Sequence, residues 1–259
     1  MPLVDSHCHL NHDELHRDLY DALDQAQKVG VERMVVVGYD LVSSKRAIAQ
    51  SRAHLSIVAA VGLHPHDASD YSSAVADELR ALARSYRTVA YGEIGLDYHY
   101  DNSPRETQRA AFERQLAVAE ELRLPVIIHS RDAADDTRAI VEDHTPLPAG
   151  GVMHCFTYGV EEMEWAVELG LHVGITGVIT FKKAEEVREV AAAVPLERLL
   201  IETDSPYMAP VPYRGRTNQP AFLPEVAVAV AQAREISPAE VEAATTRNAS
   251  LLFGELVRV

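Results

Sequence analysis

Cysteine and long apolar runs are scarce in this 259-residue chain. Because no stretch of roughly 18 apolar residues occurs, we expect no transmembrane helix and no membrane partner. The first residues, Met-Pro-Leu-Val-Asp, turn polar at once, so we expect no secretory signal peptide. Cys8 and Cys155 each stand next to a histidine, so in a strand their side chains would point away from it, toward the helix layer. We expect both to be small buried hydrophobes in a reduced, cytoplasmic protein.

Basic residues are also in short supply. The chain has 24 Lys and Arg against 39 Asp and Glu, which gives a net charge of −15. A nucleic-acid partner usually leaves a basic footprint, so the total charge argues against one. Net charge governs solubility and non-specific binding, however, rather than one local site. The positions of the basic residues therefore matter more than their number.

The order of apolar and amphipathic segments predicts the fold. Strands are expected near 3–8, 33–38, 56–62, 88–94, 125–129, 151–155, 172–176 and 198–203. Helices are expected near 12–29, 43–54, 72–85, 104–122, 132–143, 160–169, 183–193 and 222–234, with short ones at 238–245 and 247–253. Strict alternation indicates a parallel sheet, and eight units in about 250 residues is the size of a (β/α)8 TIM barrel. With no linker to divide it, we expect residues 1–259 to form one domain, an α/β barrel with extra C-terminal helices.

The longest segment without helix or strand character is 205–221. Three prolines between residues 206 and 212 exclude regular structure there. Long ordered loops tend to be functional, so this segment is a candidate wall of a substrate site.

Six potential metal ligands end apolar strands in this pattern: His7, His9, Glu93, His129, His154 and Asp204. Imidazoles and carboxylates are the ligands that Zn²⁺ and Mn²⁺ accept. A single histidine after a buried strand is more often a satisfied polar residue, so the prediction depends on the whole set. The carboxyl ends of parallel strands meet at one mouth of a barrel, where active sites lie. We therefore expect a metal-centred hydrolase site.

Position alone suggests roles for four carboxylates. An unpaired Glu93 inside a barrel would be costly to ionise, so a place between two cations suits it. Asp204 ends the eighth strand, which lies beside the first in a closed barrel. There it could bind a metal weakly and accept a proton from an attacking water. Asp5 and Glu202, each two residues from a ligand, would either orient ligands or act directly.

Eight ordered motifs give the chain a specific resemblance. They are Asp5-Ser-His-Cys-His9, Val61-Gly-Leu-His-Pro-His66, Gly92-Glu-Ile-Gly-Leu-Asp-Tyr98, Pro125-Val-Ile-Ile-His-Ser-Arg131, His154-Cys-Phe, Glu202-Thr-Asp-Ser-Pro-Tyr207, Arg214-Gly-Arg-Thr-Asn218 and Asn248-Ala-Ser-Leu-Leu-Phe253. Together they span nearly the whole sequence. The chain resembles the TatD-type metal-dependent deoxyribonucleases, which belong to the amidohydrolase-like superfamily of barrels.

The resemblance implies two metal sites. His7, His9, Glu93 and Asp204 would surround one divalent ion, and Glu93, His129 and His154 the other. It also implies that His64 contacts the substrate phosphate or orients a ligand. At Gln219 the chain departs from the family, which often has glutamate there.

The expected reaction is phosphodiester hydrolysis of DNA, as a 3′-5′ exonuclease on single-stranded ends. Two cations (Mg²⁺, Mn²⁺ or Zn²⁺) would lower the pKa of bound water and polarise the phosphoryl group, with Asp204 as base and Glu93 as bridge. The histidine-rich ligand set favours Mn²⁺ or Zn²⁺, whereas the resemblance also admits Mg²⁺.

Basic and aromatic residues follow the strands and would border the mouth. The basic ones are Arg131, Lys182, Lys183, Arg214 and Arg216, and the aromatic ones are Tyr39, Tyr98, Tyr100, Phe156, Tyr158, Phe181, Tyr207 and Tyr213. Exposed rings there could stack unpaired bases, which favours single strands over duplex. We expect His64, Tyr98, Arg131 and Arg214 to contact substrate, and leave His66 and His99 open between substrate contact and none.

Two other functions fit the same residues. One is hydrolysis of an ester, lactone or amide, including aminoacyl-RNA deacylation, because metals activate water equally well for carbonyl targets. The other is a non-catalytic metal- or nucleic-acid-binding scaffold, which would not need a positioned base such as Asp204. The sequence does not define the oligomeric state.

Overall fold

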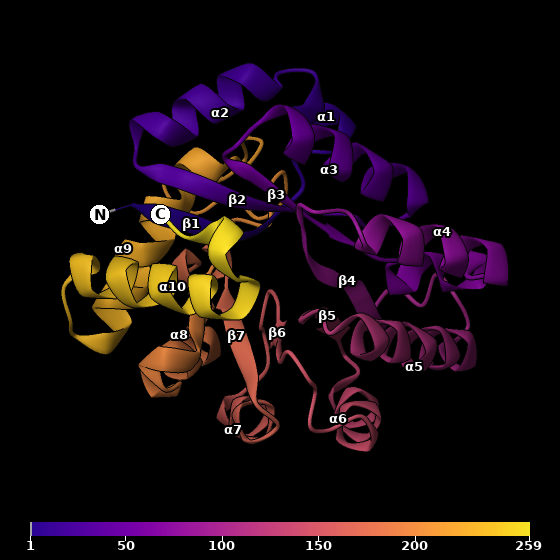
Figure 1. The fold of residues 1–259 in the computed structure, drawn as a ribbon. Helices are drawn as coiled ribbons and strands as arrows, with labels where there is room; N and C mark the ends of the chain where they lie inside the picture. Colours follow the sequence, from indigo (N-terminus) through magenta and orange to yellow (C-terminus); the bar gives the residue numbers. More distant parts are fainter. Residues whose placement is uncertain (1) are drawn as a thin grey trace.

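The computed structural model describes residues 2–259. It consists of eight parallel strands with helices around them (Figure 1). The strands are β1 (Leu3–Cys8), β2 (Val31–Val37), β3 (Ile57–Val61), β4 (Thr88–Asp97), β5 (Val126–Arg131), β6 (Gly151–Met153), β7 (Leu171–Ile175) and β8 (Leu199–Ile201). The helices are α1 (Asp13–His16), α2 (Leu19–Lys28), α3 (Leu41–Ala53), α4 (Ser73–Ala83), α5 (Arg105–Leu122), α6 (Ala134–Asp143), α7 (Val160–Glu168), α8 (Glu185–Ala193), α9 (Leu223–Arg234) and α10 (Pro238–Phe253). Short 3₁₀ helices are η1 (Pro65–Asp70), η2 (Gly177–Thr180), η3 (Leu196–Arg198), η4 (Pro220–Phe222) and η5 (Glu255–Val257). The predicted TIM barrel with C-terminal helices is confirmed.

The barrel closes between its first and last strands. Each strand pairs in parallel with the next, from β1 through to β8. Between β8 and β1, the backbone N–H of Asp204 donates to the carbonyl of His7 at 2.9 Å, and that of His9 donates to Ser205 at 2.7 Å. The Ser6 hydroxyl adds a bond to the Ile201 carbonyl at 3.0 Å. This closure places the segment after β8 directly beside the two histidines of β1.

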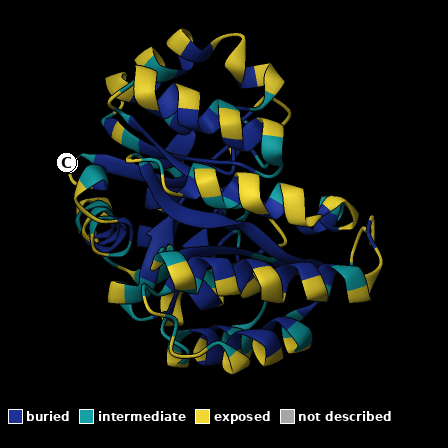
Figure 2. Ribbon diagram, turned by 45° about the vertical axis from the view of Figure 1, so that its right-hand side comes forward, coloured by how far each residue is buried: buried dark blue, intermediate teal, exposed yellow. Residues whose placement is uncertain are grey.

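Two apolar layers leave only one end of the barrel for a site. Helices pack on the outside of the sheet with their buried faces inward and exposed faces outward (Figure 2). A second cluster fills the barrel interior and includes Phe253 and Val257. Thr246 of α10 donates to the carbonyl of Pro2, and Asn248 donates to that of Leu199, so α10 covers the amino ends of the strands. The carboxyl ends therefore carry the polar site.

Two helix predictions were wrong in their boundaries. The expected helix over 12–29 is divided into α1 and α2, because Asp18 leaves the helical conformation (φ −114°, ψ 30°). The two helices expected over 238–245 and 247–253 are one, α10. There the Thr245 hydroxyl donates to the Val241 carbonyl at 2.9 Å, so this β-branched residue fits within a continuous helix.

The two cysteines differ. Cys8 is buried in the outer apolar layer, as predicted. Cys155 is only half-buried, and its sulfur lies 3.8 Å from Thr176 Oγ1 and 3.8 Å from Met208 Sδ. Its φ of 45° ends the strand alternation on which the prediction depended, so the prediction for Cys155 was wrong.

None of the helices within residues 2–259 combines the length and the apolar character needed to cross a bilayer.

Candidate metal centre

Glu93 lies inside its strand rather than at its end. β4 continues to Asp97, so the expected strand end at Glu93 was wrong. The pairing of β4 with β5 shifts register between Tyr91 and Ile94. The Glu93 backbone N–H donates to the Gly38 carbonyl at 2.9 Å. The local irregularity explains how an acidic side chain within a buried strand points into the mouth.

The two oxygens of the Glu93 carboxylate face different histidines. Its Oε1 lies 2.7 Å from His154 Nε2 and 2.9 Å from His129 Nδ1. Its Oε2 lies 3.5 Å from His7 Nε2 and 3.7 Å from His9 Nε2. The side chain is almost fully buried. Glu93 is thus the common member of two groups of donor atoms.

The first group contains His7, His9 and Asp204. Asp204 Oδ1 lies 3.3 Å from His9 Nε2 and 3.7 Å from His7 Nε2. His9 donates through Nδ1 to the Val37 carbonyl at 2.9 Å, so in its neutral form the lone pair on Nε2 points into the group. All three side chains are buried.

The second group contains His129 and His154, and His64 lies at its edge. His64 Nε2 is 3.4 Å from Glu93 Oε1. His64 Nδ1 accepts the backbone N–H of His66 at 3.2 Å, so in the neutral ring the proton is on Nε2. Burial lowers the pKa of His64 to about 4. His64 is therefore a neutral donor directed into the mouth.

The donor atoms suit a divalent metal. His7 Nε2 lies 3.1 Å from His9 Nε2, and His129 Nδ1 lies 3.2 Å from His154 Nε2. Two ring lone pairs at such a distance repel each other unless a proton or a cation lies between them. Imidazole nitrogens with carboxylate oxygens are a ligand set for Zn²⁺ and Mn²⁺. The residues present therefore fit metal binding.

The electrostatics keep the carboxylates ionised. Burial raises the pKa of both carboxyls, but the imidazoles outweigh it. They hold the pKa of Glu93 well below its usual value and also lower the pKa of Asp204. Burial likewise opposes charge on His154, yet Glu93 and Glu202 raise its pKa well above the usual value. Burial prevails at His7 and lowers its pKa.

Glu202 contacts Cys155, His154 and Ser6, which lie around the cluster. Its Oε1 accepts the backbone N–H of Cys155 at 2.6 Å and lies 3.5 Å from His154 Nδ1, while its Oε2 accepts the Ser6 hydroxyl at 3.1 Å. A Cβ on Gly174 would lie 2.7 Å from Glu202 Oε2, so only glycine leaves room for this carboxylate. Glu202 therefore contacts the back of His154, as an orienting residue would.

Asp5 joins β1 to the segment after β8. Its Oδ2 accepts the Thr203 hydroxyl at 2.6 Å, and its Oδ1 accepts the Thr203 backbone N–H at 3.0 Å. Complete burial raises the pKa of Asp5 to about 7. Its contacts run to the backbone and to Thr203, so the structure places Asp5 behind the histidines.

Three predicted substrate contacts lie outside the cluster. The Tyr98 hydroxyl donates to Asp136 Oδ2 at 2.5 Å, which ties this ring to α6. Arg131 is exposed at the end of β5, and its guanidinium lies 5.1 Å from the centre of the Tyr100 ring. Arg214 is exposed in the loop after β8. The structure does not bring these three together.

Comparison with known proteins identifies the family. A family model described as TatD related DNase matches residues 4–254. The chain belongs to this family. It is 39% identical over 251 residues to an uncharacterized metal-dependent hydrolase, YabD of Bacillus subtilis strain 168, covering 97% of this chain and 98% of that protein. It is 38% identical over 257 residues to a protein named 3′-5′ ssDNA/RNA exonuclease TatD from Klebsiella pneumoniae strain 342, covering 97% and 98%.

A solved structure agrees with this assignment. The crystal structure of YJJV, a TatD homolog from Escherichia coli K12, superposes with a TM-score of 0.92 at 32% identity and covers 97% of each chain. The resemblance predicted from the motifs is thus confirmed. The chain is a TatD-family metal-dependent hydrolase on a TIM barrel.

One residue beside the candidate metal centre was missed from the sequence. Asp97 Oδ2 lies 3.1 Å from His129 Nε2 and 3.0 Å from His66 Nε2. Its signal was available, because Asp97 is part of the motif Gly92-Glu-Ile-Gly-Leu-Asp-Tyr98 and lies four residues after Glu93, a spacing that favours the same face of one strand. Gly95 between them has φ 138°, and a Cβ there would lie 1.9 Å from the His129 carbonyl oxygen. Only glycine permits this close approach of β4 to β5.

Proposed function

We propose that this chain hydrolyses phosphodiester bonds of DNA from single-stranded 3′ ends, with two divalent cations held by the cluster. The observation that carries the proposal is the division of the Glu93 carboxylate, whose two oxygens face separate histidine pairs. A single-metal site would need only one of these pairs. A bridging carboxylate is what a two-metal site requires.

The side chains divide between two ion sites. His7, His9 and Asp204 would hold one cation with Glu93 Oε2, and His129 and His154 the other with Glu93 Oε1. When bound, the cations supply a water of lowered pKa and neutralise charge on the phosphoryl group. Mn²⁺ and Zn²⁺ suit the imidazole-rich set best.

In this proposal Asp204 accepts a proton and His64 donates a hydrogen bond. The Asp204 side chain is an ionised carboxylate, and the backbone of this residue has φ 51°. Two hydrogen bonds fix that backbone: its N–H donates to the His7 carbonyl, and its carbonyl accepts the N–H of Tyr207. The carboxylate would accept the proton of the attacking water as the water oxygen bonds to phosphorus and the P–O bond to the 3′-oxygen breaks, and the departing 3′-oxygen would take up that proton. His64 would keep its proton and donate a hydrogen bond from Nε2–H to a phosphate oxygen of the substrate.

A cationic surface beside the mouth supports a nucleic-acid substrate. We call residues 181–183 and 213–216 the mouth ridge. The Arg214 guanidinium lies 3.7 Å from the centre of the Phe181 ring, and Lys182, Lys183 and Arg216 are exposed. Within residues 2–259, none of the four cations is paired with a carboxylate. An unpaired cationic ridge offers a phosphate backbone local attraction on an acidic protein.

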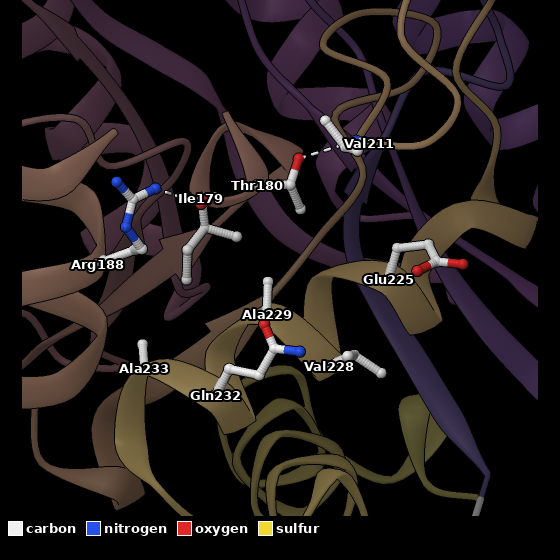
Figure 3. Close-up of a pocket in the computed structure, with 9 residues that line it drawn as sticks. All are labelled: Ile179, Thr180, Arg188, Val211, Glu225, Val228, Ala229, Gln232 and Ala233. Carbon is white, nitrogen blue, oxygen red and sulfur yellow. Dashed lines mark hydrogen bonds between the residues drawn. The ribbon is translucent and has the colours of Figure 1, made fainter. Parts of the chain in front are cut away.

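The two loops of the mouth ridge are fixed to each other. Val211 donates its N–H to Thr180 Oγ1 at 2.9 Å, and Arg188 donates to the carbonyls of Ile179 at 3.1 Å and Phe181 at 2.9 Å. Figure 3 shows the Thr180–Val211 bond and Arg188 beside a flank pocket of about 440 Å³. This pocket includes no residue of the metal cluster. Four of its lining residues, Ile179, Thr180, Arg188 and Val211, form hydrogen bonds beside the ridge.

The double variant Lys182→Ala, Arg214→Ala should bind long substrates poorly. We expect KM for a 20-nucleotide single strand to rise about tenfold at moderate salt, and the slope of log affinity against log salt to fall by about 1 to 2. Hydrolysis of a dinucleotide should stay within about twofold of wild type, because its single phosphodiester would be held at the metal site and it has no further phosphates for the ridge to bind. Steady-state kinetics at several salt concentrations measure both effects.

The matched control removes two cations elsewhere. Lys45 of α3 is paired with Glu78 of α4, and Arg138 with Glu142 within α6, so a carboxylate already neutralises each of these cations. Lys45→Ala, Arg138→Ala should therefore keep the wild-type KM and salt slope. Equal losses on the 20-mer and the dinucleotide, or no loss on either, would contradict a strand-binding role for the ridge.

The function itself is tested with 5′-labelled single-stranded DNA. Metal-free protein is incubated with the oligonucleotide and Mg²⁺, Mn²⁺ or Zn²⁺, with a chelator as control. We expect a ladder of products shortened stepwise from the 3′ end, at a higher rate than on blunt duplex and absent with chelator. No cleavage with any of the metals, together with turnover of an ester or amide, would replace the nuclease proposal with the carbonyl-directed one.

A further inference from the structure

We propose that Asp97 is a positioning residue that fixes the proton of His129 on Nε2 and so presents the Nδ1 lone pair to the second metal site. The inference rests on the proposed metal site, but not on DNA being the substrate. It assigns a role to a carboxylate that the ligand set does not include.

Asp97 is held so that its carboxylate cannot turn. It is fully buried at the end of β4. Its Oδ1 accepts the backbone N–H groups of His99 at 3.0 Å and Tyr100 at 2.9 Å. Gln108 of α5 fixes the Asp97 backbone, because its Oε1 accepts the Asp97 N–H at 2.8 Å and its Nε2 donates to the Asp97 carbonyl at 3.0 Å. Of the two carboxylate oxygens, only Oδ2 therefore faces the mouth.

The free oxygen dictates the proton positions of two histidines. Asp97 Oδ2 lies 3.1 Å from His129 Nε2 and 3.0 Å from His66 Nε2. An ionised carboxylate can only accept, so both imidazoles must donate through Nε2. With the proton on Nε2, a neutral His129 carries its lone pair on Nδ1. That atom faces Glu93 Oε1 at 2.9 Å and His154 Nε2 at 3.2 Å.

His66 anchors the same oxygen from the rim. Its ring is partly exposed and packs edge-on to Tyr100, with 5.4 Å between ring centres. It donates to Asp97 but does not approach Glu93 as His64 does. His66 therefore holds Asp97 Oδ2 toward the mouth. The sequence left His66 open between substrate contact and none, and we infer that it acts indirectly, through Asp97.

The substitution Asp97→Asn would reverse the hydrogen bond at His129 without changing the shape of the side chain. The amide oxygen must stay at the Oδ1 position, because the two backbone N–H groups of His99 and Tyr100 need an acceptor. The NH₂ group then faces His129 and can only donate. His129 would have to accept at Nε2 and move its proton to Nδ1, where the lone pair is needed for the metal. The substitution should therefore weaken one metal site selectively.

The test is calorimetric titration of metal-free protein with Mn²⁺. We expect two binding events for wild type, and in Asp97→Asn one event about 10- to 100-fold weaker, the usual cost of losing a residue that orients a metal-bound histidine. The site of His7, His9 and Asp204 should keep its affinity. Wild-type affinity at both sites in a folded Asp97→Asn protein would overturn the proposal.

Asp132→Asn is the matched control. Asp132 Oδ2 contacts His99 Nδ1 at 3.0 Å, so it is a second aspartate–histidine pair at the same mouth, but exposed and without a metal-site histidine. It should bind both Mn²⁺ ions as wild type does. A loss of affinity in Asp132→Asn equal to that in Asp97→Asn would show a general charge effect and overturn the proposal.

A second measurement needs no variant. In wild-type protein loaded with Zn²⁺, two-dimensional ¹H–¹⁵N spectra of the histidine rings report which nitrogen carries the proton. We expect His129 with its proton on Nε2 and Zn²⁺ on Nδ1; the opposite arrangement would overturn the proposal even if Asp97→Asn does not fold. Neither measurement uses DNA, so failure of the nuclease proposal and failure of this inference remain distinguishable.

Discussion

Replacing Asp204 with asparagine should lower kcat on single-stranded DNA by roughly 10³-fold, within the range that a positioned base supplies. Asparagine keeps an oxygen for the His9 side of the site, where Asp204 Oδ1 lies 3.3 Å from His9 Nε2. It cannot accept the proton of the attacking water. Metal content measured on the purified protein should therefore stay close to two ions per chain while turnover is lost.

Asp101→Asn provides the control for Asp204→Asn. Asp101 is an exposed carboxylate, paired with Arg105 at 2.7 Å at the start of α5, and it does not approach the cluster. Its replacement should leave kcat within about twofold of wild type, as surface substitutions usually do. If Asp204→Asn kept wild-type turnover, Asp204 would not be the base.

Replacing Glu93 with glutamine should abolish turnover and reduce the metal content from two ions to at most one. The amide leaves a single acceptor oxygen where Glu93 offers one oxygen to each histidine pair. In wild type, metal at 1,000 times its Kd should add about 4 kcal/mol per site to the free energy of unfolding. In Glu93→Gln we expect Mn²⁺ to raise the free energy of unfolding by less than half of the total increase in wild type. Urea unfolding with and without Mn²⁺ measures this.

A distant carboxylate–histidine pair is the control for Glu93→Gln. Glu120 Oε1 lies 2.6 Å from His144 Nδ1. Glu120 is in the last turn of α5 and His144 directly follows α6, so neither lies at the carboxyl end of a strand. Glu120→Gln should keep both the metal content and the metal-dependent gain. Two tightly bound ions in Glu93→Gln would contradict the bridging role.

The barrel was predictable because its signals are local. Each strand is a short apolar run between amphipathic helices, and eight of them in order leave few topologies open. The errors lie where local patterns are weakest. The break at Asp18 depends on one residue's backbone conformation, and the continuity of α10 depends on how Thr245 bonds within the helix.

The approach of the candidate ligands was predictable for the same reason, but their surroundings were not. His7 meets Asp204, and His129 meets His154, because parallel strands end together. The position of Glu93 within β4 depends on a register shift against β5 that the sequence pattern does not show. The contact of Asp97 with His129 depends on how closely the two strands pack at Gly95. The direction of the Tyr98 ring depends on partners from α5 and α6.

Anomalous diffraction from crystals soaked in Mn²⁺ would show whether Glu93 joins two metal sites. We expect two manganese peaks, one among His7, His9 and Asp204 and one between His129 and His154, with one Glu93 oxygen on each. A single peak, or peaks that leave Glu93 uncoordinated, would contradict this arrangement.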